Sequence, residues 1–181
     1  MYSFENIAMA SAHKNLSTYD EASLPDAAPM RFGIVVADWN AEITHALYAG
    51  CHETLLKHGA VDANIHTLQV PGTFELPAAA RMLAGRQKLD AVICLGCVIK
   101  GETKHDEYIN GAVSQGLVNL SIATGQPFIF GVLTPNSQEQ ALDRAGGMHG
   151  NKGVEAAVTA IRMAQLYRDS KTGKKSIGFG N

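Results

Sequence analysis

The segment G-C-V-I-K-G-E-T-K-H-D-E-Y, residues 96–108, carries the strongest structural signal of this 181-residue chain. An apolar run over 91–98 ends within it, a polar turn follows over 101–104, and a helix is expected from His105. A strand that leads through such a turn into a helix is typical of parallel α/β sheets. The turn can present N–H groups to an anion, and an imidazole can transfer protons near neutral pH. The segment therefore predicts an enzyme that acts on a small phosphorylated substrate.

The alternation of strand and helix continues on both sides of this segment. Apolar runs predict further buried strands over 32–37 and 128–133, and an alternating pattern predicts another over 63–70. Helical spacing of apolar residues predicts helices between Asn40 and Gly59 and over 75–83, 105–123, 137–144 and 154–164. We therefore predict one α/β domain of the flavodoxin-like class: a three-layer α/β/α sandwich around a four-stranded parallel sheet.

Composition limits the possible classes of function. The net charge of −2 gives no electrostatic case for a nucleic-acid partner. Apolar runs are too short to span a membrane, and the first 30 residues lack the apolar core of a secretory signal. We expect a cytoplasmic protein with no nucleic acid and no membrane as partner. A charged fraction of only 18% hints at surface buried by oligomerisation.

Two terminal segments differ from the domain over 31–167. Residues 1–30 are rich in Ser, Asp, Ala and Pro and form an N-terminal arm, which is expected to be partly disordered. A disordered end and a segment that lies on a neighbouring subunit are both consistent with this arm. Residues 168–181 carry Arg and Lys among small residues and are expected to form a flexible basic tail.

Three cysteines are too few for a disulfide framework. Cys94 and Cys97 have the C-x-x-C spacing, which in other contexts serves redox chemistry or zinc binding. Here the pair falls in an apolar strand with no second pair elsewhere, so structural packing is the favoured interpretation. No pattern of His, Cys or carboxylates has metal-ligand spacing, and no metal is expected.

Ligands of parallel sheets bind beyond the carboxyl ends of the strands. The loops there contain Trp39, which either covers the sheet edge or stacks on a planar heterocycle. Glu75 is either a helix-start carboxylate or an acceptor for substrate hydroxyl groups. The turn at 101–104 is either an ordinary capped turn or an anion site. Arg144 and Lys152 flank a glycine-rich run and suit an anionic substrate, although solubility also explains surface cations.

Five motifs occur in a fixed order: V-P-G-T-F-E-L-P at 70–77, the segment at 96–108, F-G-V-L-T at 130–134, E-Q-A-L-D-R-A-G at 139–146 and G-N-K-G-V-E-A-A at 150–157. In these motifs the chain resembles the lumazine synthase family, from about residue 31 to residue 166. The resemblance implies condensation of 5-amino-6-(D-ribitylamino)uracil with 3,4-dihydroxy-2-butanone 4-phosphate. The implied products are 6,7-dimethyl-8-ribityllumazine, orthophosphate and water, in the penultimate step of riboflavin biosynthesis, without a cofactor. A non-catalytic flavin- or lumazine-binding protein, or a shell protein, on the same fold is the alternative.

The resemblance also implies a role for each matching residue. His105 matches the proton-transfer histidine. The residues expected around the pyrimidine and its ribityl chain are Trp39, Thr73, Phe74, Glu75, Cys97, Val98, Ile99 and Lys152. The residues expected at the phosphate are Glu102, Thr103 and Arg144. Phe130 and Arg144 are expected from an adjacent subunit, and Glu155 is expected to orient Lys152.

The resemblance also implies an oligomeric state, and a few positions of this chain differ from the family pattern. The family forms pentamers, and many members assemble twelve of them into a hollow icosahedral 60-mer. The run over 146–152 lacks the insertion of members restricted to pentamers, so the shell is the favoured assembly, with the arm pairing with a neighbour. Trp39 stands where Phe is frequent, and Met148 and His149 replace a more typical Lys-Ala pair.

Overall fold

The chain folds around one parallel sheet, as a computed structural model that describes residues 17–172 shows. The strands are β1 (Phe32–Ala37), β2 (Ile65–Val70), β3 (Ala91–Cys97) and β4 (Phe128–Leu133), in the order β2-β1-β3-β4. Every neighbouring pair is parallel, so all four carboxyl ends meet at one edge of the sheet. The predicted four-stranded parallel sheet is confirmed.

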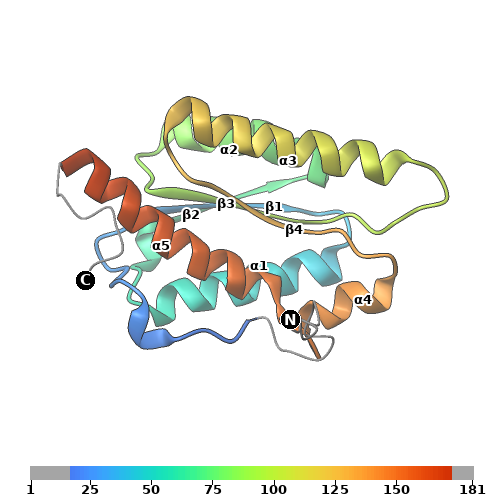
Figure 1. The fold of residues 1–181 in the computed structure, drawn as a ribbon, viewed down its shortest axis with the longest axis horizontal. Coiled ribbons are helices and arrows are strands. Elements are labelled where there is room, and N and C mark those ends of the chain that lie inside the picture. Colours follow the sequence, from blue (N-terminus) through green and yellow to red (C-terminus); the bar gives the residue numbers. More distant parts are fainter. Residues whose placement is uncertain (1–16, 173–181) are drawn as a thin grey trace, which may run out of the picture.

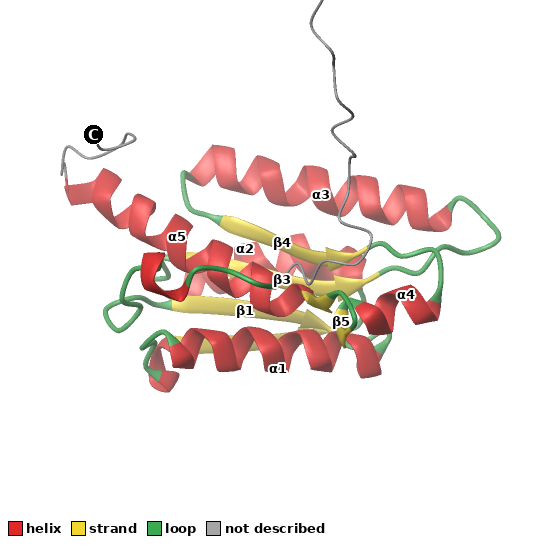
Figure 2. Ribbon diagram, turned by 60° about the horizontal axis from the view of Figure 1, so that its bottom comes forward, coloured by secondary structure: helices red, strands yellow, loops and turns green. Residues whose placement is uncertain are grey.

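Helices cover both faces of this sheet (Figure 1). Helices α1 (Ala41–Lys57) and α5 (Lys152–Thr172) lie on one face, and α2 (Leu76–Arg86) and α3 (His105–Thr124) lie on the other. The short α4 (Gln138–Asp143) lies beyond the end of β4 (Figure 2). This arrangement is the predicted three-layer α/β/α sandwich.

The central strands β1 and β3 are continuous apolar runs because both of their faces are buried, whereas the edge strand β2 mixes apolar and polar residues. Phe32, Ile34 and Val36 of β1 belong to the core under α1 and α5. Val35 and Ala37, which point the other way, belong to the core under α2 and α3. This two-sided burial is the reason why periodicity alone indicated strands without an exposed face.

Most element ends follow the expected local chemistry. Gly59, after α1, and Gly125, after α3, have φ values of +95° and +68°, which favour glycine at a helix end. Ser137 caps α4 by accepting a hydrogen bond from the Gln140 N–H. The second helix begins later than predicted, because residues Thr73–Glu75 form a 3₁₀ turn (η3) before Leu76.

The glycine-rich run after Arg144 is ordered, where the sequence predicted a flexible loop. Strand β5 (Ala145–Gly147) and strand β6 (Gly150–Asn151) form a small antiparallel hairpin that leads directly into α5. The hairpin packs against α1, α4 and α5. Its strands are too short and too poor in apolar residues for a sequence pattern to reveal them.

Residues 17–30, the described part of the predicted arm, lie along the chain's own α1 and α5. Ala27 and Met30 are fully buried in the core. The Ser17 hydroxyl contacts the backbone of Asn151, and the Tyr19 hydroxyl lies 2.9 Å from Nε2 of His58. The remainder of the arm, residues 1–16, and residues 173–181 of the predicted tail lie outside the described residues.

Helix α3 carries three large apolar side chains that are exposed, Tyr108, Val118 and Ile122. Only Val113 and Leu117 of its 20 residues are buried, whereas Tyr108 is 75% and Ile122 is 77% exposed. Apolar side chains on an exposed helix face typically mark a contact surface. Within residues 17–172, no helix is both long and apolar enough to span a membrane.

Candidate active site

The carboxyl ends of β1, β2 and β3 surround a hollow of about 800 Å³. It lies where ligands bind in parallel α/β sheets, beyond the strand ends. We call it the histidine hollow, and its main lining residues are Trp39, Asn40, Thr73, Phe74, Glu75, Cys97, Val98, Ile99, Thr103 and His105. Nine residues that the sequence predicted for the site therefore come together in one place.

Trp39 forms the rim of the histidine hollow. The loop that carries it is fixed by two backbone hydrogen bonds, from Asp38 N–H to Val70 O at 2.8 Å and from Trp39 N–H to Pro71 O at 3.1 Å. The indole itself is 72% exposed. An exposed indole on a fixed backbone is free to stack on a planar ring that enters the hollow.

Asn40 lines the hollow and also occupies the N-cap position of α1. It is the only non-glycine residue with positive φ in the described chain, at φ 61° and ψ 47°, and its side chain makes no cap hydrogen bond. Instead, its amide Nδ2 donates to the Cys97 carbonyl at 3.0 Å and so ties the β1 loop to the end of β3. The sequence feature that could have indicated this conformation is the residue type, since Asn tolerates the left-handed region.

Thr73 and Gly96 pack closely below the hollow. A β-carbon at Gly96 would lie 2.7 Å from Oγ1 of Thr73, so a glycine is required for this approach. Oγ1 of Thr73 is buried and has no hydrogen-bond partner among the described residues. Phe74 and Glu75, in the same 3₁₀ turn, are exposed and face the hollow.

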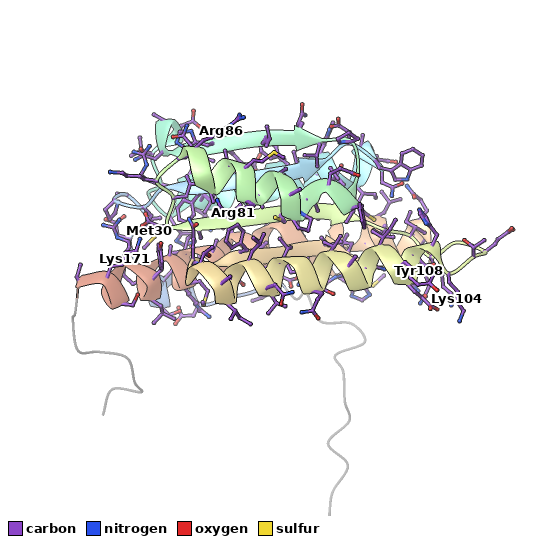
Figure 3. All side chains as sticks on the ribbon, turned by 90° about the horizontal axis from the view of Figure 1, so that it is seen from above. Met30, Arg81, Arg86, Lys104, Tyr108 and Lys171 are labelled. Atoms are coloured by element: carbon purple, nitrogen blue, oxygen red, sulfur yellow. The ribbon has the colours of Figure 1, made fainter. Side chains whose placement is uncertain are left out.

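The first turn of α3 forms one wall of the histidine hollow. Lys104 occupies the N-cap position without a side-chain cap hydrogen bond, so the first amide groups of this long helix have no acceptor from their cap. His105, the first helical residue, is exposed and lines the hollow with Thr103. Figure 3 shows Lys104 and Tyr108 at this end of the molecule, opposite Lys171. Glu102 is exposed in the same turn but does not line the hollow.

The cysteine pair is part of the core, as the sequence favoured. Cys94 and Cys97 are free and buried in β3. Burial raises the pKa of the Cys97 thiol to about 11, and it raises the pKa of the Cys94 thiol further. Both thiols are therefore protonated and unreactive at neutral pH.

A second hollow, of about 510 Å³, lies at the end of the edge strand β4. We call it the arginine hollow, and its main lining residues are Phe130, Thr134, Gln140, Asp143, Arg144, His149 and Lys152. Three of the other four predicted residues, Phe130, Arg144 and Lys152, come together here, and the fourth, Glu102, lines neither hollow.

Glu155 organises the two cations of the arginine hollow. Its carboxylate lies 3.0 Å from Nη2 of Arg144 and 3.0 Å from Nζ of Lys152. All three side chains are largely buried, so these ion pairs are better shielded from water than surface pairs. The geometry supports the expectation that Glu155 orients Lys152. It indicates that Glu155 orients Arg144 in the same way.

The two hollows differ in chemistry. In the described part of the chain, no Lys or Arg lines the histidine hollow, whereas two fixed cations line the arginine hollow. One can therefore hold an apolar ring beside a proton-transfer group, and the other can hold an anion. No cluster of three or more potential metal ligands occurs among residues 17–172.

Comparison with known proteins assigns the family. The sequence profile of the 6,7-dimethyl-8-ribityllumazine synthases matches residues 29–168. A 6,7-dimethyl-8-ribityllumazine synthase of Cytophaga hutchinsonii is 56% identical over 155 residues, which cover 86% of this chain and 97% of that protein.

Two further relatives with the same name agree with this match. The protein of Parabacteroides distasonis is 53% identical over 158 residues, covering 87% of this chain and 99% of its own. That of Porphyromonas gingivalis is 51% identical over 160 residues, covering 88% and 99%. With this similarity over nearly the whole length of its relatives, the chain belongs to the 6,7-dimethyl-8-ribityllumazine synthase family.

Proposed function

We propose that the histidine hollow of one protomer and the arginine hollow of a neighbouring protomer together form one active site. Membership of the family makes the chain an enzyme of riboflavin biosynthesis, a transferase that forms a ribityllumazine by condensation. The proposed substrates are 5-amino-6-(D-ribitylamino)uracil and 3,4-dihydroxy-2-butanone 4-phosphate.

The observation that carries this proposal is the separation of the two hollows within one chain. His105 lines one, and Arg144 and Lys152 line the other. A phosphate leaving group needs fixed positive charge, which the lining of the histidine hollow lacks. Each hollow is chemically incomplete, and a neighbouring copy supplies what the other half needs.

In the proposed complex, the pyrimidine ring stacks on Trp39 and its ribityl chain extends towards Glu75. Backbone groups of residues 97–99 contact the edge of the ring. The phosphate of the second substrate lies between the first turn of α3 and Arg144 of the neighbour, with Thr103 beside it. Holding both reactants in one closed site supplies much of the acceleration.

His105 is the proposed proton-transfer group. The substrate amine attacks the ketone carbon, and loss of water gives an imine. Breaking the carbon–oxygen bond to phosphate then releases orthophosphate and leaves an enol, which tautomerises to a ketone. The ribitylamine nitrogen attacks this carbonyl, and loss of a second water closes the lumazine ring. Each step moves protons, and an exposed imidazole at the hollow can relay them. Arg144 and the N–H groups of the α3 turn stabilise the departing phosphate.

The exposed apolar face of α3 supports assembly through this surface. We propose a ring of five protomers, in which each contact joins two different patches, and a shell of twelve such rings. The run over 146–152 lacks the insertion that the resemblance associates with members restricted to pentamers, which favours the shell.

A complementation experiment tests the shared site. His105→Ala and Arg144→Ala variants are unfolded together, refolded as mixed oligomers and assayed by lumazine fluorescence. Because a head-to-tail contact uses one half from each protomer, about a quarter of the contacts regain two intact halves. The activity of the mixture should therefore greatly exceed that of either variant alone.

The double variant His105→Ala/Arg144→Ala, refolded with the wild-type protein, is the matched control. If the mixed single variants show no gain over the separate proteins, the site does not span two copies. Tight binding of a lumazine by intact protein without turnover would instead show a binding protein on the same fold.

A further inference from the structure

We propose that His149 takes up a proton when a phosphate binds in the arginine hollow, and so sets the strength of that binding near neutral pH. This inference rests on the proposed function, which places the phosphate of the substrate there. It assigns a specificity role to a second histidine, distinct from His105 in both location and purpose.

The backbone fixes His149 at the hollow. It lies at the turn of the β5–β6 hairpin, where its N–H donates to the Asp143 carbonyl at 3.0 Å and its carbonyl accepts from Nη1 of Arg144 at 3.5 Å. Gly147 in the same turn packs so closely that a β-carbon there would lie 2.8 Å from Cα of Asp143. The hairpin therefore holds residue 149 in place whatever its side chain.

The imidazole of His149 is free to interact with a ligand. The residue is half-buried and lines the hollow with Arg144 and Lys152. Its ring makes no hydrogen bond to any residue of the described chain, unlike the rings of His52 and His58. Both ring nitrogens remain available, one of them to donate to a phosphate oxygen when the ring is protonated.

The charge balance of the hollow makes this proton important. Two cations, Arg144 and Lys152, face two carboxylates, because Glu155 binds both of them and Asp143 also lines the hollow. The lining residues from β4 are apolar, and among the residues described α1 contributes no charged side chain to the lining. With a neutral imidazole the hollow therefore has no excess positive charge.

A bound phosphate changes the proton affinity of this imidazole. A phosphate monoester carries between one and two negative charges near neutral pH. A negative charge next to an imidazole favours the protonated ring, so binding draws a proton from solution. The ring then supplies the excess positive charge that the ion-paired Arg144 and Lys152 lack.

Competitive inhibition by sulfate is the direct test, because sulfate is a dianion throughout the range from about pH 6 to pH 9 and does not itself titrate there. For the wild-type protein, inhibition against the butanone phosphate should weaken by about tenfold as the pH rises from about 6 to about 8.5. Sulfate should inhibit the His149→Gln variant weakly, and this inhibition should not depend on pH over the same range. His149→Lys should bind sulfate tightly at both ends of it.

Two controls separate the possible outcomes. His45→Gln, an exposed histidine of α1 outside both hollows, should keep the wild-type pH profile. Calorimetric titration with sulfate in two buffers of different ionisation enthalpy should show proton uptake by the wild type and none by His149→Gln. Equal proton uptake by the two proteins, or an unchanged pH profile in His149→Gln, would overturn the role of His149.

Failure of this inference is distinguishable from failure of the proposed function. If Arg144→Ala abolishes sulfate inhibition while His149→Gln behaves as the wild type, the hollow binds the anion without help from His149. If Arg144→Ala leaves sulfate inhibition unchanged, the anion binds elsewhere and the proposed site itself is wrong.

Discussion

The histidine hollow and the arginine hollow are built by different means. The first lies over three strand ends and is fixed by backbone hydrogen bonds and the left-handed Asn40. The second lies at the edge strand β4 and is formed by the end of α4 and the short β5–β6 hairpin. The carboxylate of Glu155 holds its two cations in place. The comparison indicates that ring recognition depends on backbone geometry, and anion recognition on side-chain charge.

This difference predicts distinct kinetic effects. Substitutions in the histidine hollow should change the chemical step or the affinity for the pyrimidine. Substitutions in the arginine hollow should change the affinity for the phosphate substrate. Variants in either hollow that change all kinetic parameters equally would contradict the division.

The largest effect is expected for His105→Ala. Loss of the proton-transfer group should lower kcat by about 10³-fold. KM for the phosphate substrate should change little, because Arg144 and the amide groups of the α3 turn remain. Steady-state assays with each substrate varied in turn measure both quantities. A variant with normal kcat and a raised KM for the phosphate substrate would assign His105 to phosphate binding instead.

A smaller effect is expected for Arg144→Ala. Loss of a charge-assisted contact should raise KM for the phosphate substrate by about 100-fold, while KM for the pyrimidine stays within about twofold. The variant should also lower kcat, because Arg144 stabilises the departing phosphate. Arg81→Ala on α2 is the matched control, since that exposed arginine lines neither hollow. A comparable rise of KM for the pyrimidine would show that the two hollows do not divide the substrates.

Asn40 distinguishes backbone geometry from side-chain contact in the histidine hollow. Asn40→Gly keeps the left-handed conformation and loses only the hydrogen bond to Cys97, which should lower the free energy of unfolding by about 1 kcal/mol. Asn40→Ala loses the bond and also strains the backbone, so it should cost about 2 kcal/mol. Urea unfolding of the two variants measures the difference. If alanine is no worse than glycine, the left-handed backbone does not constrain this loop.

The same contrast explains which parts of the molecule the sequence could predict. Strand patterns predicted the position of the histidine hollow, because the loops after parallel strands must meet at one edge. The family resemblance supplied Cys97, Val98 and Ile99. Trp39, Thr73 and His105 lie in or just beyond the loops that follow β1, β2 and β3. Asn40 occupies the N-cap position of α1, but its side chain binds the Cys97 carbonyl and not a helix amide. Residue type does not separate these two uses.

The arginine hollow was less predictable, for physical reasons. The hairpin over 145–151 has neither apolar alternation nor enough length to show a strand pattern, and it is held by packing against α1, α4 and α5. His149 could not be assigned to the hollow from sequence, since only the folded hairpin places it beside Arg144 and Lys152. Its one sequence signal was the departure from the more typical Lys-Ala pair at 148–149.

An effect of similar size to those of the Asn40 substitutions is an alkaline loss of stability centred on the histidine hollow. Burial raises the pKa of the Cys97 thiol from 9.0 to about 11, so the folded state favours the protonated form. The stabilisation is complete below pH 9, and it is lost as the pH rises through 11. At a pH about one unit above the unfolded value, Cys97 should account for a loss of about 1.4 kcal/mol in the free energy of unfolding.

Cys97→Ala should remove this contribution while the other two buried thiols, Cys51 and Cys94, retain theirs. The measurement is therefore the slope of the unfolding free energy against pH from 9 to 11, compared between wild type and variant, and not the stability at one pH. The arginine hollow contains no thiol, so its sulfate affinity should not follow this slope. An identical slope in the variant would mean that water reaches the Cys97 thiolate through the histidine hollow. The lower part of that hollow would then be more hydrated than its apolar lining implies.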